Sequence, residues 1–122
     1  MPRLPMLIAF CGLSLLGLWP QIAWGHAFPH HSEPPVGASL TTAPSHVRIW
    51  FDGALEPAFS SIHVQDAGGQ KADTGDGHVD PADPTLLEAS LLPLHPGTYR
   101  VIWSVVARDG HRTEGDFTFT IR

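Results

Sequence analysis

Hydrophobic and polar side chains alternate along much of the chain beyond residue 45, with the two-residue period that is typical of half-buried β-strands. The clear runs are residues 47–51, 62–65, 98–106 and 117–121, and residues 86–92 form a weaker one. The apolar positions of the clear runs are Val47, Ile49 and Phe51; Ile62 and Val64; Tyr99, Val101, Trp103 and Val105; and Phe117, Phe119 and Ile121. Because alternate residues of a strand share one face, we expect these positions to form the core.

Turn-forming residues separate the runs, at residues 43–45, 66–69 and 94–97. No stretch after residue 25 has a convincing apolar period of an amphipathic helix. Several short strands at this spacing predict an all-β Greek-key sandwich or small barrel of about seven strands. Residues 73–84 are rich in Asp, Gly and Pro, and we expect a mobile loop there.

The first 25 residues have the pattern of a secretory signal peptide. Arg3 supplies a positive start, residues 7–19 are apolar, and residues 23–25 provide small residues at the positions expected for cleavage. The apolar run is too short to span a membrane comfortably. A lipid anchor at Cys11 is the alternative, but a bulky phenylalanine precedes that cysteine. We therefore expect cleavage directly before His26.

Cleavage would leave one domain, residues 26–122, whose composition limits its functions. Removal of 25 residues from 122 leaves 97, which suits a single small domain. Six basic and twelve acidic side chains give this domain a net charge of about −6, without a basic cluster, so nucleic acid is a poor partner. It has no cysteine and no methionine but keeps all eight histidines. A metal that accepts nitrogen and oxygen donors is therefore favoured.

Asp109 and His111 are the first candidate site residues. Residues two apart in extended backbone leave by the same face, so this carboxylate and imidazole can hold one metal ion or simply hydrogen-bond in a surface turn. His26 can supply the missing donors if cleavage makes it the first residue, because its α-amine and Nδ1 close a six-membered ring on a metal. The resulting three nitrogens and one oxygen suit the square-planar preference of Cu(II). Since the amine must lose its proton, binding should weaken as the pH falls.

Three blocks of sequence carry a resemblance to a known family. They are residues 26–40, with the pattern H-A-x-x-x-x-S-x-P-x-x-G-A-x-L; residues 43–60, with Ala-Pro-x-x-Val, a later phenylalanine and Phe-Ser; and residues 96–119, with Pro-Gly-Thr-Tyr-x-Val-x-Trp-x-Val-Val, Asp-Gly-His and Gly-x-Phe-x-Phe. In this order they resemble the CopC family of periplasmic copper-resistance proteins over essentially the whole domain. The resemblance implies an immunoglobulin-like (cupredoxin-like) β-sandwich that binds one Cu(II) ion through the positions of His26, Asp109 and His111.

The chain departs from the family pattern at two places. Many members have an acidic residue two positions after the phenylalanine of the second block, where this chain has Gly53. Any outer-sphere or axial role of that acidic residue at the metal would therefore fall to Asp52 or be lost. Many members also have proline after the Asp-x-His motif, where this chain has Arg112. Members with a Cu(I) site use a methionine-rich segment, and this domain has no methionine. The resemblance therefore implies a Cu(II)-only member.

The resemblance implies a periplasmic carrier or buffer for Cu(II), acting in copper homeostasis or resistance, and we expect it to be a monomer. The family association suggests a CopD-type inner-membrane copper transport protein as partner. One alternative is an enzyme, because oxidative polysaccharide-cleaving enzymes also bind copper through an N-terminal histidine. Asp109 opposes that alternative, since a carboxylate ligand favours Cu(II) over Cu(I), and we expect no catalysis. A non-metal immunoglobulin-like interaction module is the second alternative.

The other histidines are weaker candidates. His30 and His31 suggest a weak second copper site, although Phe28 stands where the amino-terminal copper motif needs histidine and Pro29 lacks the amide that it uses. His63 alternates outward in its predicted strand and is expected to face solvent. The remaining ones, in predicted turns or loops, are His46, His78 and His95.

Overall fold

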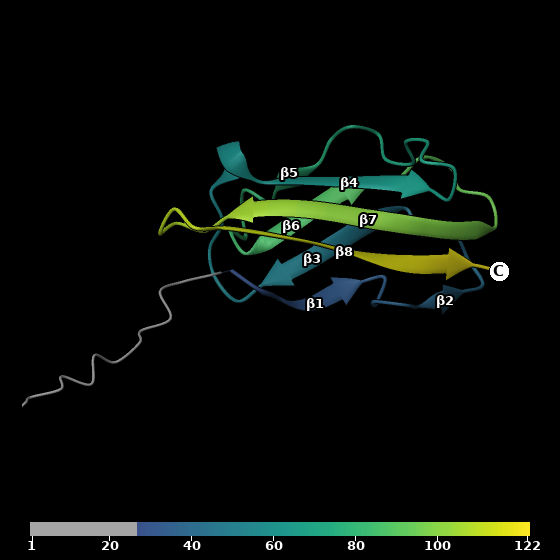
Figure 1. The fold of residues 1–122 in the computed structure, drawn as a ribbon, viewed down its shortest axis with the longest axis horizontal. Helices are drawn as coiled ribbons and strands as arrows, with labels where there is room; N and C mark the ends of the chain where they lie inside the picture. Colours follow the sequence, from purple (N-terminus) through teal and green to yellow (C-terminus); the bar gives the residue numbers. More distant parts are fainter. Residues whose placement is uncertain (1–26) are drawn as a thin grey trace, which may run out of the picture.

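The computed structural model describes residues 27–122, which form two four-stranded β-sheets packed face to face as a sandwich (Figure 1). The elements are β1 (Pro29–Glu33), β2 (Ser39–Leu40), β3 (His46–Phe51), the single 3-10 turn η1 (Pro57–Phe59), β4 (Ser61–Asp66), β5 (His78–Val79), β6 (Leu86–Ser90), β7 (Gly97–Val106) and β8 (Arg112–Ile121). The predicted all-β sandwich is confirmed, with eight strands in the described range where about seven were expected. Within that range, no helix is long and apolar enough to cross a membrane.

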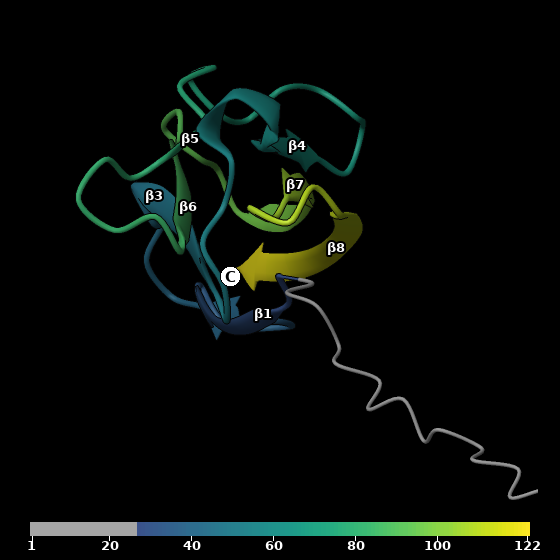
Figure 2. The same cartoon turned by 90° about the vertical axis from the view of Figure 1, so that its left-hand side faces the viewer.

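The strand order is β1-β3-β6-β5 in one sheet and β2-β8-β7-β4 in the other. Neighbouring strands run antiparallel except β2 and β8, which are parallel. β7 and β8 form a long hairpin whose pairs run from Gly97↔Ile121 to Val106↔Arg112. Figure 2 looks along the sandwich and shows the two sheets around a common core, with β1 next to β8 at one edge. The turn of the long hairpin, between β7 and β8, lies at one end of the sandwich (Figure 1).

The core consists of the inward-facing residues of both sheets, and every apolar strand position singled out in the sequence is buried. The Trp103 ring meets Phe51 edge-on with ring centroids 5.3 Å apart, and Tyr99 stacks on Phe119 at 5.5 Å. Burial of a large apolar side chain contributes about 1.5–3 kcal/mol relative to leaving it exposed. The side chains at the alternating apolar positions thus pack together and hold the two sheets against each other.

Residues 73–84 differ from the expected loop. β5 lies within them and pairs with β6. The Asp73 side chain is buried, and its Oδ2 accepts a hydrogen bond from the Val64 N–H at 2.8 Å, which ties the segment to β4. Asp80 and Asp83 accept hydrogen bonds from backbone N–H groups two residues farther on. Where a loop was expected, the segment has one two-residue strand and tight turns whose backbone N–H groups are satisfied by these carboxylates.

Candidate metal centre

The candidate ligands Asp109 and His111 lie in the turn that joins β7 to β8. Two backbone hydrogen bonds close this turn: the Ala107 N–H donates to the His111 carbonyl, and the Gly110 N–H donates to the Ala107 carbonyl, both at 2.9 Å. Gly110 has a φ of +89°, a left-handed conformation that residues with a side chain rarely adopt. The glycine between the two candidate ligands is therefore required by the shape of the turn.

Asp109 and His111 contact each other twice within the turn. The His111 N–H donates to Asp109 Oδ1 at 3.0 Å, and His111 Nδ1 lies 3.1 Å from Asp109 Oδ2. A carboxylate beside Nδ1 favours the tautomer with its proton there, which places the lone pair on Nε2. The Asp109 side chain is 21% exposed and that of His111 57%, so an ion from solvent can reach both. This arrangement occurs in metal sites and also in ordinary hydrogen-bonded turns.

The start of the described chain is fastened at the same end of the sandwich (Figures 1 and 2). Ala27 is fully buried, and its carbonyl accepts a hydrogen bond from the Thr113 hydroxyl at 2.8 Å. Thr113 lies in β8, two residues after His111. The Phe28 N–H donates to Asp52 Oδ1 at 2.8 Å, and the Asp52 N–H donates to the Phe28 carbonyl at 2.9 Å. The chain therefore enters the fold at a fixed point beside the β7–β8 turn.

His26, the third candidate ligand, lies outside the described residues. Among residues 27–122, no three histidine, cysteine, aspartate or glutamate side chains are arranged so that they could hold a metal ion. A metal site at the β7–β8 turn would therefore depend on the donors that the sequence assigns to His26.

Asp52, which precedes the departing position Gly53, and Arg112 both make defined contacts. Asp52 binds the backbone of Phe28 on both sides, as described above. Arg112 donates from Nη1 to the Ser104 hydroxyl at 2.6 Å and to the Phe59 carbonyl at 3.5 Å. Its charge is therefore held towards β7 and η1.

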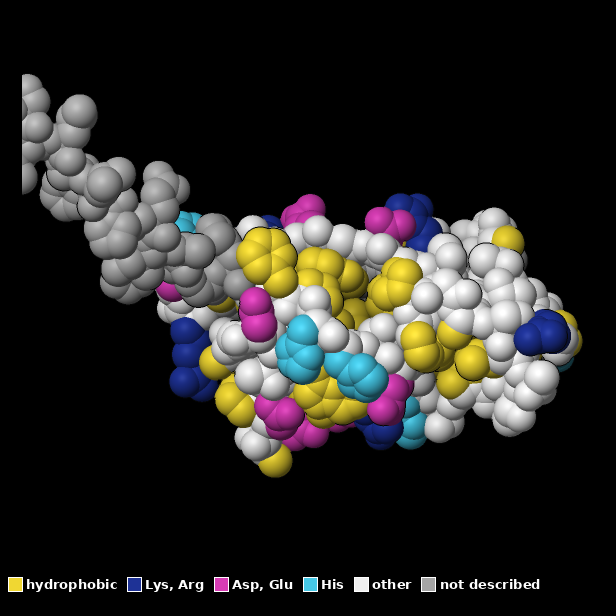
Figure 3. All heavy atoms as spheres, turned by 90° about the horizontal axis from the view of Figure 1, so that it is seen from below, with side chains coloured by type: hydrophobic (Ala, Val, Ile, Leu, Met, Phe, Trp, Pro, Cys, Tyr) yellow, Lys and Arg dark blue, Asp and Glu magenta, His cyan; other side chains and the backbone are white. Residues whose placement is uncertain are grey.

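A groove of about 460 Å³ lies between β1 and β8. Its lining includes the core residues Ile49 and Trp103, and Figure 3 shows histidines beside an apolar hollow on this side of the molecule. The histidines that line the groove are His30 and His31. At Gly115 a Cβ would overlap the Trp103 ring, so the absence of a side chain lets this ring pack against β8. The groove is thus mainly an apolar surface, with the two histidines at its β1 side.

The proposed weak second site at His30 and His31 does not form a cluster of donors. His31 packs against Trp50 with ring centroids 5.1 Å apart, and its Nε2 lies 3.5 Å from Glu33. The described residues contain no third ligand arranged around this pair. The pair remains a sequence-based suggestion.

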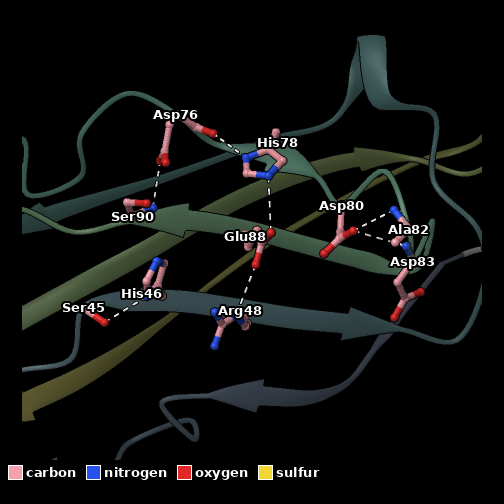
Figure 4. Close-up of polar contacts among 10 residues, drawn as sticks. All are labelled: Ser45, His46, Arg48, Asp76, His78, Asp80, Ala82, Asp83, Glu88 and Ser90. Carbon is pink, nitrogen blue, oxygen red and sulfur yellow. Dashed lines mark hydrogen bonds and ion pairs between the residues drawn. The ribbon is translucent and has the colours of Figure 1, made fainter.

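A second group of histidines and carboxylates covers the outer face of the sheet that contains β3, β6 and β5 (Figure 4). Arg48 Nε donates to Glu88 Oε2 at 3.1 Å, and His78 Nε2 lies 3.3 Å from Glu88 Oε1. His78 Nδ1 lies 2.6 Å from the Asp76 carbonyl oxygen. His46 and His78 were expected in turns or loops, but they lie in strands. Sequence reasoning missed this group of side chains because its residues come from three separate segments of the chain.

Comparison with known proteins now places the chain in a family. Residues 30–122 match the family model described as the CopC domain. The chain belongs to the CopC family. It is 33% identical over 100 residues to "Protein YobA" of Escherichia coli K12, a match that covers 81% of each chain. It is also 29% identical over 110 residues to "Copper transport protein CutJ" of Bacillus subtilis, covering 89% of this chain and 20% of that protein.

The fold agrees with this CopC membership. The crystal structure of CopC from Methylosinus trichosporium OB3b matches with a TM-score of 0.69 and 30% identity, covering 79% of this chain and 93% of that one. The resemblance stated from the sequence, and the immunoglobulin-like sandwich that it implied, are therefore confirmed. The CopC family match begins at residue 30, after the candidate ligand His26.

Proposed function

We propose that this protein is a periplasmic Cu(II) carrier or buffer, which binds one ion through the amine and imidazole of His26 together with Asp109 and His111. The observation that carries the proposal is the hydrogen bond from the Thr113 hydroxyl to the Ala27 carbonyl. It ties the residue that follows His26 to the strand that begins next to His111. One peptide bond joins His26 to Ala27, so cleavage of the leader would release the new amine near the β7–β8 turn.

The chemistry of the donors supports Cu(II). Each carboxylate oxygen has two lone pairs, so an Asp109 oxygen that accepts a hydrogen bond from His111 can in principle also bind a metal ion. The tautomer of His111 favoured by Asp109 presents Nε2 as the donor. An N-terminal histidine adds an amine and an imidazole nitrogen, and this sulfur-free set of nitrogen and oxygen matches the preference of Cu(II).

The CopC membership and the name of the Bacillus relative support a role in copper handling. In that relative, a copper transport protein by name, the matched region is 20% of the whole chain. Its remainder suggests a transport partner for this smaller protein, and we propose a CopD-type inner-membrane protein in that position. The signal-like first 25 residues support export to the periplasm. We propose that the protein acts as a monomer and catalyses no reaction.

Two versions of the protein test the copper site, one beginning at His26 and one with a single extra residue before it. An extra residue moves the amine away from the imidazole and prevents the six-membered chelate ring. The first version should bind one equivalent of Cu(II) tightly, with nitrogen-rich tetragonal EPR parameters. The second should bind far more weakly. Equal binding by the two versions would contradict a role for the amine.

A matched control is His63→Ala in the version that begins at His26. His63 is an exposed imidazole on β4, and its removal should change neither the stoichiometry nor the EPR spectrum. The affinity of the unmodified site should fall as the pH is lowered, because the amine and the imidazoles must lose their protons to bind. Competition titrations at two pH values measure this dependence.

A further inference from the structure

We infer that Thr113 and Asp52 are positioning residues, which hold the start of the mature chain so that its amine meets Asp109 and His111. This inference rests on the proposed function and concerns two residues that give no donor to the metal. The first residues of a domain are ordinarily poorly ordered unless they are tied down. A metal site needs its ligands within about half an ångström of their working positions. The chain start therefore needs anchors outside the set of ligands.

Thr113 anchors the chain start from β8. Its hydroxyl donates to the Ala27 carbonyl at 2.8 Å across 86 residues of sequence. Ala27 is 0% exposed, so its carbonyl needs a hydrogen-bond partner within the fold. Thr113 pairs with Val105 in the hairpin whose turn carries Asp109 and His111. One strand thus connects the candidate ligands of the turn with the residue that follows the N-terminal ligand.

Asp52 anchors the chain start from the other sheet. It directly follows β3 and makes two hydrogen bonds with Phe28, one to each backbone group. Together with the bond from Thr113, three hydrogen bonds fix Ala27 and Phe28, the two residues between His26 and β1. The anchors come from both sheets, so the position of the chain start follows the packing of the whole sandwich.

The anchors should raise the copper affinity, because an unanchored chain start would lose more conformational entropy than an anchored one when its amine binds the metal. Contacts that orient metal ligands without touching the metal typically change affinity by about 10- to 100-fold. We expect the loss of the Thr113 hydroxyl to weaken Cu(II) binding about tenfold. A merely structural role would lower the melting temperature of the metal-free protein and leave the affinity unchanged.

The first experiment compares Thr113→Val with Thr113→Ser in the version that begins at His26. Valine keeps the shape of the side chain and removes the hydroxyl, whereas serine keeps the hydroxyl. Competition with a chelator of known affinity should show about tenfold weaker Cu(II) binding by the valine variant and near-normal binding by the serine variant. Equal affinity of the valine variant and the unmodified protein would overturn the inference for Thr113.

The second experiment separates the hydrogen bond of Asp52 from its charge. Asp52→Asn keeps an oxygen that accepts from the Phe28 N–H but removes the negative charge, and Asp52→Ala removes both. We expect the alanine variant to bind Cu(II) more weakly and the asparagine variant to bind nearly as the unmodified protein does. Equal weakening by both variants would show that the charge acts instead of the bond, and would overturn the assignment of Asp52.

The third experiment adds one residue before His26 in the unmodified protein and in Thr113→Val. If Thr113 acts through the chain start, the extra residue should cost less affinity in the variant, because the two changes damage the same interaction. An equal cost in both proteins would overturn the inference alone. No cost in the unmodified protein would instead refute the proposed copper site, so the two failures can be told apart.

Discussion

Two of the histidine–carboxylate pairs among the described residues have similar distances between nitrogen and oxygen. His111 Nδ1 lies 3.1 Å from Asp109 Oδ2, and His78 Nε2 lies 3.3 Å from Glu88 Oε1. Both pairs are partly open to solvent. The difference between them lies in their surroundings, and it decides which pair we assign to a metal.

Glu88 already has a cation beside it. Arg48 contacts its second oxygen, and the other ring nitrogen of His78 faces the Asp76 carbonyl (Figure 4). A guanidinium supplies the positive charge that a metal ion would otherwise bring to the carboxylate. We therefore interpret the contacts of Glu88 with Arg48 and His78 as a brace, that is, a set of contacts that holds β3, β6 and β5 together. The contact between a histidine and a carboxylate does not by itself identify a metal site.

The Asp109–His111 pair lies in a turn beside an anchored chain start. Two residues beyond His111, the Thr113 hydroxyl donates to the Ala27 carbonyl. On the proposed function, this place would receive the amine that leader cleavage creates at His26. Glu88 is thus held by an arginine, whereas the Asp109–His111 pair lies where the proposed function would bring the N-terminus.

The largest expected effect is the loss of copper binding when a proposed ligand of the turn is removed. Asp109→Ala and His111→Ala should each lower the Cu(II) affinity at least about 100-fold, because loss of a ligand should exceed loss of a contact that only orients one. Competition titration measures the affinity, and thermal unfolding of the metal-free protein checks the fold. Glu88→Ala is the control, and we expect its affinity to be unchanged. A similar loss in that control would break the distinction between the two pairs.

Removal of Glu88 should have the next largest effect, on stability. Its side chain is 17% exposed and contacts Arg48 and His78, which would be left facing each other in Glu88→Ala. We expect a loss of about 1 kcal/mol in the free energy of unfolding. For a domain of this size, that corresponds to a fall in melting temperature of about 4–8 °C. Urea or thermal unfolding measures it, and a stability equal to that of the unmodified protein would contradict the brace.

His78→Ala should have a smaller effect. This change removes one ion pair with a half-exposed histidine and leaves the contact between Arg48 and Glu88 in place. Partly exposed pairs of this kind contribute about 0.2–1 kcal/mol. Urea unfolding should therefore show a loss below that of Glu88→Ala, with copper affinity unchanged. A loss larger than that of Glu88→Ala would show that His78 stabilises β5 through other contacts.

The smallest expected effect concerns the pH dependence of stability at Asp76. Hydrogen bonds from the side chain and backbone of Ser90 lower the pKa of Asp76 from 3.8 to about 2. A lowered pKa in the folded protein means that the ionised carboxylate stabilises the fold above its ordinary pKa, and that this contribution is lost as the pH falls through about 2. Asp76→Asn should therefore be less stable than the unmodified protein at neutral pH, and the difference should shrink as the pH falls towards about 2. A difference that stays constant with pH would contradict this.

Much of the fold could be predicted from alternation, because buried strands must place apolar side chains on one face. β3, β4, β7 and β8 follow this rule. β1 could not be found in this way, since four of its five residues are exposed and only Ser32 is buried. Its place is set by pairing with β3, which leaves no period in its own sequence.

The candidate site was partly visible in the sequence. The spacing of Asp109 and His111 predicted that the two side chains lie together, and they do, but in a turn with Gly110 at a φ of +89° and not in the extended backbone that the prediction assumed. The anchoring by Thr113 and Asp52 could not be predicted, since a threonine hydroxyl and an aspartate after a strand have many ordinary uses. Their partners lie 86 and 24 residues away in the sequence, so only the fold brings them together.

On the proposed function, the full burial of Ala27 would make copper binding sensitive to the position of leader cleavage. Because Ala27 is buried and Phe28 is hydrogen-bonded through both backbone groups, a shift of the chain by one residue would break these contacts. On the proposed mechanism, a cut one residue late removes the imidazole, and a cut one residue early displaces the amine. On the proposed function, the exact position of leader cleavage would thus determine which molecules can bind copper.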